Sequence, residues 1–333
     1  MKLAIIVLLL INAQSCTSSQ VERENFRVIA HRGASAYLPE NTLEATAMAH
    51  AFGPDFLECD LQLTKDNIPM VLHDRSLEST TNVSEVFPKR HRDDGRYYAI
   101  DFSWEEIQKL RVFERRRGEV LAFPGRFPEQ SAPQLRVPSF AEWIELIEGM
   151  NESRGVQVGI YVEVKASPAY TNEGRDILAI VLEVLREYGY EDKTDKVFLQ
   201  SFDPVDLIRA KEEFNTKIPL IQLIGMNEWP GAPADYVHMI TEEGLQKVAE
   251  YAVGIGPFYR LLYDIDSKGR PQATLLSKTA KQLGLEIHPF THRSDQLWEG
   301  FQSNDELLKF VVKTLGVHGV FTDHSDHVIQ FFK

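Results

Sequence analysis

The stretch Val28-Ile29-Ala30-His31-Arg32-Gly33 joins a short apolar run to a histidine and an arginine, and this pattern decides the fold. The pattern returns in Phe56-Leu57-Glu58-Cys59-Asp60-Leu61, in Val71-Leu72-His73-Asp74 and in Tyr161-Val162-Glu163-Val164-Lys165. Each apolar run predicts a β-strand, so each charged or imidazole side chain is expected at the carboxyl end of a strand. Parallel α/β folds, and barrels in particular, place their chemistry at that end.

Strand candidates recur along the whole chain, with helical stretches between them. A helix over 42–51 is expected to begin with Asn41 as its cap and to end at Gly53, while Ser103 and Ser139 each open a capping box. Strand followed by helix, repeated eight times, predicts an α/β fold of the (β/α)₈ TIM barrel type over residues 25–333. The expected strands are 27–30, 56–63 with 71–72 just after it, 158–164, 197–201, 218–223, 254–256, 286–290 and 317–321.

One segment interrupts this alternation. Residues 75–137 separate the second and third barrel strands, and they are rich in charged residues, glycine and proline with aromatic side chains between them. This connection is far longer than the usual link between a strand and a helix. A surface decoration is the alternative, but a loop that leaves the carboxyl end of a strand lies over the mouth of the barrel. We therefore expect an inserted segment that acts as a lid or lines the substrate pocket.

The first residues are typical of an export signal. Met1-Lys2 is a short basic start, residues 3–11 are apolar, and small or polar residues follow up to Cys16. The apolar run is too short to span a bilayer, so a signal peptide over 1–16 is expected rather than an anchor helix. Ala13-Gln14-Ser15-Cys16 resembles a bacterial lipobox, and both lipidation of Cys16 and ordinary cleavage nearby stay open. The mature chain is thus expected in the periplasm, free or lipid-anchored, without a transmembrane segment.

Composition narrows the class of protein. The 333 residues are 43% hydrophobic and 26% charged, which is ordinary for a globular protein with a large core. The formal charge of −13 argues against nucleic acid or an anionic membrane as a partner. Cys16 and Cys59 are the only cysteines, so no disulfide framework is expected, and Cys59 should point into the layer between strand and helix. The oligomeric state is not readable, and a dimer stays open.

Three carboxylates form the strongest group of candidate site residues. Glu58 and Asp60 are two residues apart on one strand, so both side chains face the same side. Glu163 ends the next barrel strand, and three acids that converge repel one another unless a cation lies between them. An acid at a strand end is more often part of a structural ion pair, but three such acids favour a metal. Oxygen ligands suit Ca²⁺ or Mg²⁺, whereas zinc prefers Cys and His.

Two histidines and two cations complete the candidate site. His31 and His73 each end an apolar strand beside a charged residue, and each can donate or accept a proton near neutral pH. Arg32 and Lys165 are suited to binding phosphate oxygens. This combination favours phosphoryl transfer chemistry over acyl or glycosyl transfer. The other histidines considered are interpreted as packed, hydrogen-bonded bystanders, namely His50, His91, His238, His318 and His327.

At these residues the chain resembles the glycerophosphodiester phosphodiesterase family. The resemblance covers essentially the whole chain after the signal. Its bacterial periplasmic branch is indicated by residues 95–102, 251–257 and 288–291, whereas Cys59 and Phe290 depart slightly from the usual residues. The family motifs are carried by Ala30-His31-Arg32-Gly33, Pro39-Glu40-Asn41-Thr42, Glu58-Cys59-Asp60, Leu72-His73-Asp74, Glu163-Val164-Lys165 and Phe321-Thr322-Asp323.

The resemblance implies a barrel with an inserted small domain, one bound Ca²⁺ or Mg²⁺, and hydrolysis of glycerophosphodiesters. Substrates such as glycerophosphocholine or glycerophosphoethanolamine would yield sn-glycerol 3-phosphate and an alcohol. Phospholipase D-like action on lysophospholipids and a non-catalytic lipoprotein that binds glycerophosphodiesters are the alternatives. By position, the resemblance implies catalytic His31 and His73, metal ligands Glu58, Asp60 and Glu163, and phosphate contacts Arg32 and Lys165.

Overall fold

The structure is a computed structural model that describes residue 23 and residues 26–128, 134–194 and 196–333. The expected signal peptide over 1–16, with the lipobox-like stretch that ends at Cys16, lies outside the described residues. Export to the periplasm, free or lipid-anchored, therefore stays a prediction. Within the described ranges, no helix combines the length and the apolar character that crossing a membrane requires.

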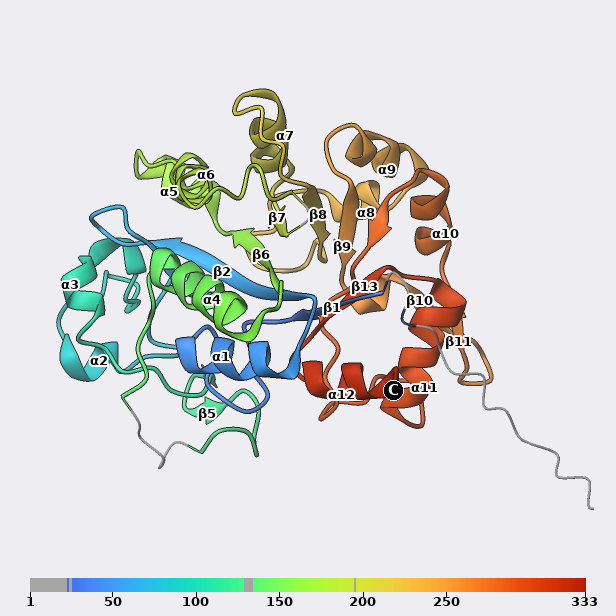
Figure 1. Cartoon of the computed structure of the whole chain (residues 1–333), viewed down its shortest axis with the longest axis horizontal. Coiled ribbons are helices and arrows are strands. Elements are labelled where there is room, and N and C mark those ends of the chain that lie inside the picture. The colour runs from blue at the N-terminus through green and yellow to red at the C-terminus, as the bar shows by residue number, and fades with distance from the viewer. Residues whose placement is uncertain (1–22, 24–25, 129–133, 195) are drawn as a thin grey trace, which may run out of the picture.

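Eight parallel strands form a nearly closed barrel, which confirms the predicted TIM-barrel fold (Figure 1). The edge strands meet through backbone hydrogen bonds, from the His318 amide to the Ile287 oxygen (2.9 Å) and from the His292 amide to the Phe321 oxygen (2.8 Å). In order around the barrel the strands are β12 (Glu286–Ile287), β9 (Gly254–Pro257), β8 (Leu220–Ile224), β7 (Val197–Ser201), β6 (Gly159–Val164), β2 (Phe56–Leu63), β1 (Arg27–Ala30) and β13 (Gly319–Thr322).

The strand bounds agree with the sequence prediction to within two residues, except in β12. That strand was expected over 286–290, but its ladder ends at Ile287. Pro289 has no amide hydrogen to donate, so regular pairing stops before it. A further strand, β3 (Pro69–Val71), pairs antiparallel with the end of β2 and places Val71 opposite Leu61. The runs 56–63 and 71–72 thus belong to one unit, as expected.

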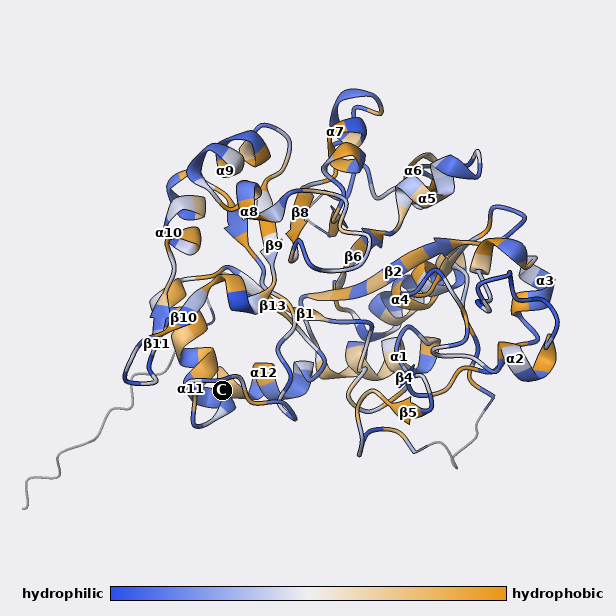
Figure 2. Cartoon of the chain, turned by 180° about the vertical axis from the view of Figure 1, so that it is seen from behind, coloured by the Kyte–Doolittle hydropathy of each residue, from blue (hydrophilic) through white to orange (hydrophobic). Residues whose placement is uncertain are grey.

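The helices surround the barrel and bury one side against it, so hydrophobic and hydrophilic residues alternate along them (Figure 2). The capping boxes predicted at Ser103 and Ser139 are both present, and Gly53 ends the first helix as predicted. The barrel helices are α1 (Leu43–Phe52), α4 (Phe140–Arg154), α5 (Ser167–Asn172), α6 (Ile177–Glu187), α7 (Pro204–Glu212), α8 (Tyr236–Met239), α9 (Glu242–Ala249), α10 (Leu275–Gln282), α11 (Asn304–Lys309) and α12 (Ser325–Phe331).

The prediction that Asn41 caps the first helix is wrong. Thr42 is the cap, because its Oγ1 accepts a hydrogen bond from the Ala45 amide at 3.2 Å. Asn41 instead takes a left-handed backbone conformation with φ of 61°. Its Nδ2 donates to Asp60 Oδ2 at 3.0 Å, so its side chain belongs to the site and not to the helix.

Apolar side chains fill two layers. Six residues of the barrel strands pack together in one small cluster, namely Ile29, Phe56, Tyr161, Phe198, Ile221 and Phe321. A much larger cluster contains the opposite faces of the strands together with the helices. Cys59 is fully buried in this larger cluster, which confirms that it points away from the Glu58 and Asp60 side of β2.

The described part of the segment 75–137 folds as a small packed unit between β3 and α4. It contains α2 (Val83–Val86), α3 (Trp104–Ile107) and a short hairpin of β4 (Arg116–Arg117) and β5 (Val120–Leu121). In Figure 1, α2 and α3 lie at one end of β2, and β5 lies next to α1. Its interior is a separate apolar cluster that includes Phe102, fully buried. The Lys65 amide of the β2–β3 connection donates to the Phe102 oxygen at 2.8 Å.

Candidate active site

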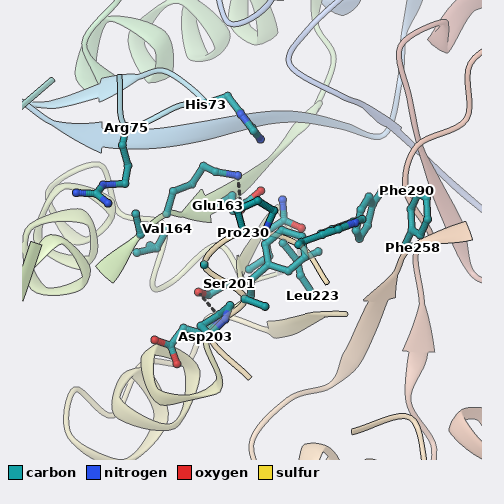
Figure 3. A pocket seen from close by; sticks show the side chains of 18 of the residues that line it. His73, Arg75, Glu163, Val164, Ser201, Asp203, Leu223, Pro230, Phe258 and Phe290 are labelled. Atoms are coloured by element: carbon teal, nitrogen blue, oxygen red, sulfur yellow. Dashed lines mark hydrogen bonds and ion pairs between the residues drawn. The ribbon is translucent and has the colours of Figure 1, made fainter. Parts of the chain in front are cut away.

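A cavity of about 730 Å³ is lined at the carboxyl ends of the barrel strands (Figure 3). Six of the seven residues predicted from the sequence line it, and Asp60 is fully buried beside them. The five histidines interpreted as bystanders do not line the cavity. The prediction that all five are packed is wrong for His91, His238 and His327, which are exposed. The lining residues that the sequence predicted are His31, Arg32, Glu58, His73, Glu163 and Lys165.

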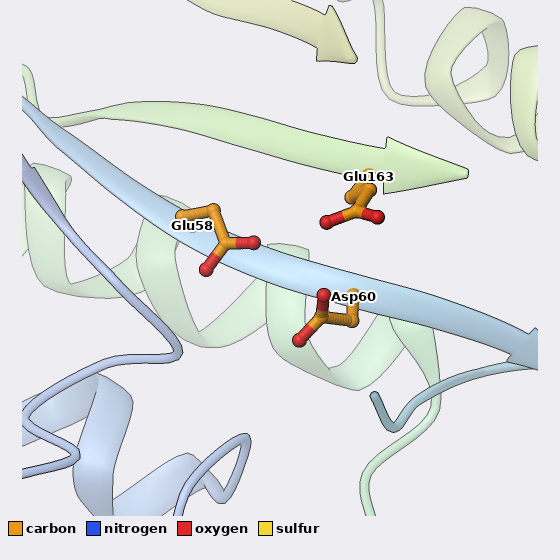
Figure 4. A group of neighbouring side chains, drawn as sticks. All are labelled: Glu58, Asp60 and Glu163. Atoms are coloured by element: carbon orange, nitrogen blue, oxygen red, sulfur yellow. The ribbon is translucent and has the colours of Figure 1, made fainter. Parts of the chain in front are cut away.

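The three carboxylates come together as predicted (Figure 4). Glu58 and Asp60 project from β2, and the parallel ladder between β2 and β6 sets Glu163 directly beside Asp60. One carboxylate oxygen from each residue lies within 4.8 Å of the others, and all three side chains are buried. The cluster could therefore hold a metal ion.

Two cations lie against these acids. Arg32 Nε is 3.1 Å from Asp60 Oδ2, and the Arg32 amide donates to Glu58 Oε2 at 2.7 Å. Lys165 Nζ is 2.7 Å from Glu163 Oε1 and 3.3 Å from Asp60 Oδ1. Both predicted phosphate-binding side chains thus lie beside the acid cluster, with little exposure to solvent.

Burial and repulsion distribute the charge unevenly among the three acids. Burial and the nearby Asp60 raise the pKa of Glu58 well above its usual range. Burial also raises the pKa of Glu163 to about 7, although Lys165 opposes this. Burial alone would raise the pKa of Asp60, but Arg32 and Lys165 overcome it and hold this pKa well below its usual range. Without a further cation, Asp60 is the acid that keeps its negative charge.

The turn after β1 aims the backbone of Arg32 at the acid cluster. Arg32 and Gly33 both have positive φ, of 58° and 80°. Gly33 also lies against the first helix, where a Cβ atom would be only 2.7 Å from the Ala45 carbonyl carbon. Glycine is therefore required both by the backbone conformation and by the close approach to the helix.

Replacement of Gly33 by alanine should destabilise the fold more than replacement of Gly53 by alanine. Both glycines have φ near 80°, but a Cβ atom on Gly53 would meet nothing within 4 Å. The difference in the free energy of unfolding, measured by urea titration, should be about 1 to 3 kcal/mol because the new methyl group at position 33 overpacks the helix. Equal losses in the two variants would show that the close approach carries no cost.

His31 is held by a carboxylate from the last barrel strand. Its Nδ1 is 2.7 Å from Asp323 Oδ1, and Asp323 directly follows β13. Burial and the adjacent Arg32 lower the pKa of His31, so its ring is neutral at pH 7. Because the carboxylate accepts the proton on Nδ1, the free electron pair of the neutral ring lies on Nε2.

His73 has the same arrangement with its own neighbour in sequence. Its Nδ1 is 2.5 Å from Asp74 Oδ1. Burial, together with Arg32 and Lys165, lowers the pKa of His73 to about 4. Both predicted catalytic histidines are thus neutral imidazoles with Nδ1 bound to an aspartate, which suits proton transfer through Nε2.

Several residues of the site were missed by sequence reasoning. Asp323 appeared there only within a motif, although it follows an apolar run as Asp74 does, and that signal could have identified it. Gln200, at the end of β7, donates to Glu58 Oε1 at 3.4 Å. Asn41 was interpreted as a cap because Asn and Thr are both common in that position.

The aromatic wall of the cavity comes from loops that follow the barrel strands and not from the described residues of the segment 75–137. Of those described residues only Arg75 lines the cavity, so the lid or pocket role expected for the segment stays a prediction. The rings of the segment are used elsewhere, as Phe102 is in its own core. The cavity is walled instead by aromatic residues that follow β7, β8, β9 and β12, namely Phe202, Trp229, Phe258 and Phe290.

Comparison with known proteins agrees with the geometry. Residues 31–327 match the Glycerophosphoryl diester phosphodiesterase family. A glycerophosphodiester phosphodiesterase of Haemophilus influenzae is 40% identical over 92% of this chain and 89% of its own length. A protein of the same name from Treponema pallidum is 32% identical over 91% of each chain.

Solved structures show the same fold. A structure described as a putative glycerophosphoryl diester phosphodiesterase from Silicibacter pomeroyi superposes with a TM-score of 0.70 at 25% identity, over 92% of each chain. A phosphodiesterase of Oleispira antarctica, solved in complex with its product sn-glycerol-3-phosphate, superposes with a TM-score of 0.62 at 23% identity over 92% of this chain and 96% of its own. The chain therefore belongs to the glycerophosphodiester phosphodiesterase family and is a phosphoric diester hydrolase.

Proposed function

We propose that the protein hydrolyses glycerophosphodiesters such as glycerophosphocholine or glycerophosphoethanolamine to sn-glycerol 3-phosphate and an alcohol, with a divalent metal and two histidines. One observation carries the proposal: three buried carboxylates within 4.8 Å of one another lie in one site with two histidine–aspartate pairs. The release of sn-glycerol 3-phosphate from glycerophosphocholine, measured with and without a chelator, tests the proposal directly.

The acid cluster fits a hard divalent cation. Its donors are all carboxylate oxygens, which suit Ca²⁺ or Mg²⁺. Asp60 Oδ1 accepts no hydrogen bond from the described residues, although Lys165 Nζ lies 3.3 Å away. Glu58, Asp60 and Glu163 would hold the ion, which when bound would polarise a phosphate oxygen and offset negative charge.

Arg32 and Lys165 are suited to holding the substrate phosphate. Both line the cavity, and their side chains are only 14% and 13% exposed. A buried guanidinium presents a planar fork that matches two phosphate oxygens, and a buried ammonium adds a compact charge. Together they would orient the phosphodiester and neutralise its oxygens as the ester bond breaks.

The two histidines would divide the proton transfers. One Nε2 takes the proton from the nucleophile, which is either water or the 2-hydroxyl of the glycerol. The other histidine must first take up a proton from solvent on its Nε2, and it donates this proton to the departing alkoxide, so the alcohol leaves neutral. Attack by water incorporates its oxygen directly, whereas attack by the glycerol hydroxyl passes through a cyclic phosphate. Which histidine takes which part follows from the assay given in the Discussion.

The aromatic wall favours a cationic alcohol such as choline. The Trp229 ring centroid is 5.2 Å from that of Phe258 and 6.2 Å from that of Phe202. Asp203 lines the same cavity. Aromatic faces beside a carboxylate bind quaternary ammonium groups through cation–π and Coulomb attraction. A neutral alcohol would gain neither interaction.

Replacement of Trp229 by alanine should therefore raise KM for glycerophosphocholine by about tenfold and leave kcat nearly unchanged. The same change should affect glycerophosphoglycerol, whose alcohol is neutral, by less than about threefold. Trp104→Ala is the control, because Trp104 lies in the segment 75–137 and does not line the cavity. Equal effects on the two substrates would contradict recognition of the cation. Lysophosphatidylcholine, assayed in parallel, tests the phospholipase D-like alternative.

A further inference from the structure

Two arginines of the segment 75–137 bind the aspartates that hold the two histidines. Arg115 Nη1 is 2.7 Å from Asp74 Oδ2, while the other oxygen of Asp74 binds His73. Arg126 Nη2 is 2.9 Å from Asp323 Oδ2, while the other oxygen of Asp323 binds His31. The same series of contacts, from an arginine to an aspartate to a histidine, thus occurs twice, once on each side of the site.

Neither arginine is a surface residue or part of the cavity wall. The Arg115 and Arg126 side chains are 14% and 4% exposed, and neither lines the cavity. Burying a guanidinium is costly unless its partners are well placed. Arg115 also binds Glu40 through two bonds of 2.7 and 2.8 Å, and Glu40 Oε1 accepts from Arg32 Nη1 at 3.0 Å.

We propose that Arg115 and Arg126 are positioning residues, through which the segment 75–137 holds His73 and His31 in the orientation that proton transfer requires. The inference rests on the proposed function, since it assumes that both histidines transfer protons. It gives the segment a part in catalysis, although its aromatic residues do not line the pocket.

The shared aspartates explain how the arginines act at a distance. A carboxylate held from both sides keeps its rotamer and its negative charge, so it continues to accept the Nδ1 proton and fixes which ring nitrogen is free. In both aspartates burial opposes ionisation, but the histidine and arginine partners keep the pKa well below its usual range. Loss of the arginine would leave the carboxylate free to turn away from the imidazole.

The two sides differ in what remains after an arginine is lost. Asp323 Oδ2 also accepts from Arg293 Nε at 2.7 Å, so it would keep one cation without Arg126. Among the described residues, Asp74 Oδ2 would keep only the neutral Ser79 hydroxyl. We therefore expect the loss of Arg115 to be the more severe change.

The experiment compares kcat and KM for glycerophosphocholine in the full chain with saturating Ca²⁺. Arg115→Gln should lower kcat by about 10- to 100-fold, the usual range when a residue that orients a reacting group, but does not itself react, is lost. Arg126→Gln should lower kcat by a smaller factor, with KM unchanged within about twofold. Arg90→Gln is the matched control, because Arg90 pairs with Glu106 in the same segment at 2.6 Å and should leave both constants unchanged.

A double-mutant cycle separates positioning from general stability. In an Asp74→Asn background, Arg115→Gln should lower kcat far less than it does in the parental chain, because no carboxylate remains at position 74 for the arginine to hold, and only its contact with Glu40 is still lost. Independent losses that multiply would overturn the proposal. If Arg115→Gln fails to fold, Arg115→Lys gives a second test. A lysine that contacts Asp74 should retain part of the parental kcat. A fully folded Arg115→Lys variant as inactive as His73→Ala would also overturn the proposal.

The outcomes distinguish this inference from the proposed function. If His31→Ala and His73→Ala lose turnover while folded Arg115→Gln and Arg126→Gln keep parental kcat, the positioning role is wrong and the two-histidine mechanism stands. If the histidine variants themselves keep parental turnover, the proposed mechanism fails, and the positioning role fails with it.

Discussion

Replacement of His31 or His73 by alanine should lower kcat by about 10²- to 10⁴-fold and leave the fold intact. Each imidazole is in place for proton transfer, with Nδ1 bound to an aspartate and Nε2 free to accept or donate a proton. Because the pKa of His73 is lowered to about 4, this ring needs no deprotonation at pH 7 before it accepts a proton. Steady-state kinetics on glycerophosphocholine, with circular dichroism of each variant, measure the effect.

An exposed histidine supplies the control. His91 lies in the segment 75–137, where its Nδ1 is 2.9 Å from the Arg92 carbonyl oxygen, and His91→Ala should keep parental turnover. If a folded His31→Ala or His73→Ala variant also kept it, that residue would have no part in proton transfer.

A substrate with a good leaving group can show which histidine acts as the general acid. A p-nitrophenyl diester expels p-nitrophenolate, which needs no proton to leave, so loss of the acid histidine should matter far less for this substrate than for glycerophosphocholine. Loss of the base histidine should slow both substrates alike. The variant whose defect shrinks on the activated diester therefore identifies the acid, and equal defects in both variants would contradict a division of labour between the two rings.

Removal of the metal should abolish turnover, and Ca²⁺ or Mg²⁺ should restore it while zinc restores little. The reason is the all-carboxylate donor set of Glu58, Asp60 and Glu163, which lacks the His and Cys ligands that zinc prefers. Activity is measured after exhaustive chelation and again after each ion is added back. Full turnover in protein shown to be free of metal would contradict both the ligand assignment and the mechanism.

The stability of the metal-free protein provides a second test of the assignment of Glu58 and Asp60 to the metal site. Glu58 has a raised pKa from burial and from Asp60, so the folded state disfavours its charge, and stability is lost as pH rises above the ordinary range of a glutamate. Glu58→Gln should therefore raise the urea midpoint of metal-free protein at pH 8 while abolishing activity. Asp60→Asn should lower both the urea midpoint of the metal-free protein and the activity measured with metal, because Arg32 and Lys165 would lose the carboxylate that they share.

The barrel and the reacting groups could be predicted because they depend on local patterns. A short apolar run that ends in a polar side chain specifies both a strand and the edge at which that side chain emerges. Glu58, Asp60 and Glu163 needed nothing more than strand alternation and parallel pairing to meet. The same reasoning placed His31 and His73 at one mouth, and the structure brings both to the cavity.

The rest depends on contacts that no local pattern contains. Asn41 and Thr42 are adjacent and both suited to capping, so only the backbone conformation of the turn decides which one reaches Asp60. The aromatic wall consists of side chains on separate loops, whose directions follow from loop geometry. Arg126 meets an aspartate 197 positions further along the chain, a contact that neither composition nor periodicity indicates.

The first and last barrel strands are neighbours, and this has a consequence for how the protein matures. Strand β1 pairs with β13 over four residues, and His31 takes its aspartate from the residue that follows β13. During synthesis the amino-terminal strand is complete long before its partner has been made. Neither the closed barrel nor the His31–Asp323 pair can form until Asp323 has left the ribosome. We therefore expect a chain truncated before β13 to be inactive, and hydrolysis to begin only when this strand has docked.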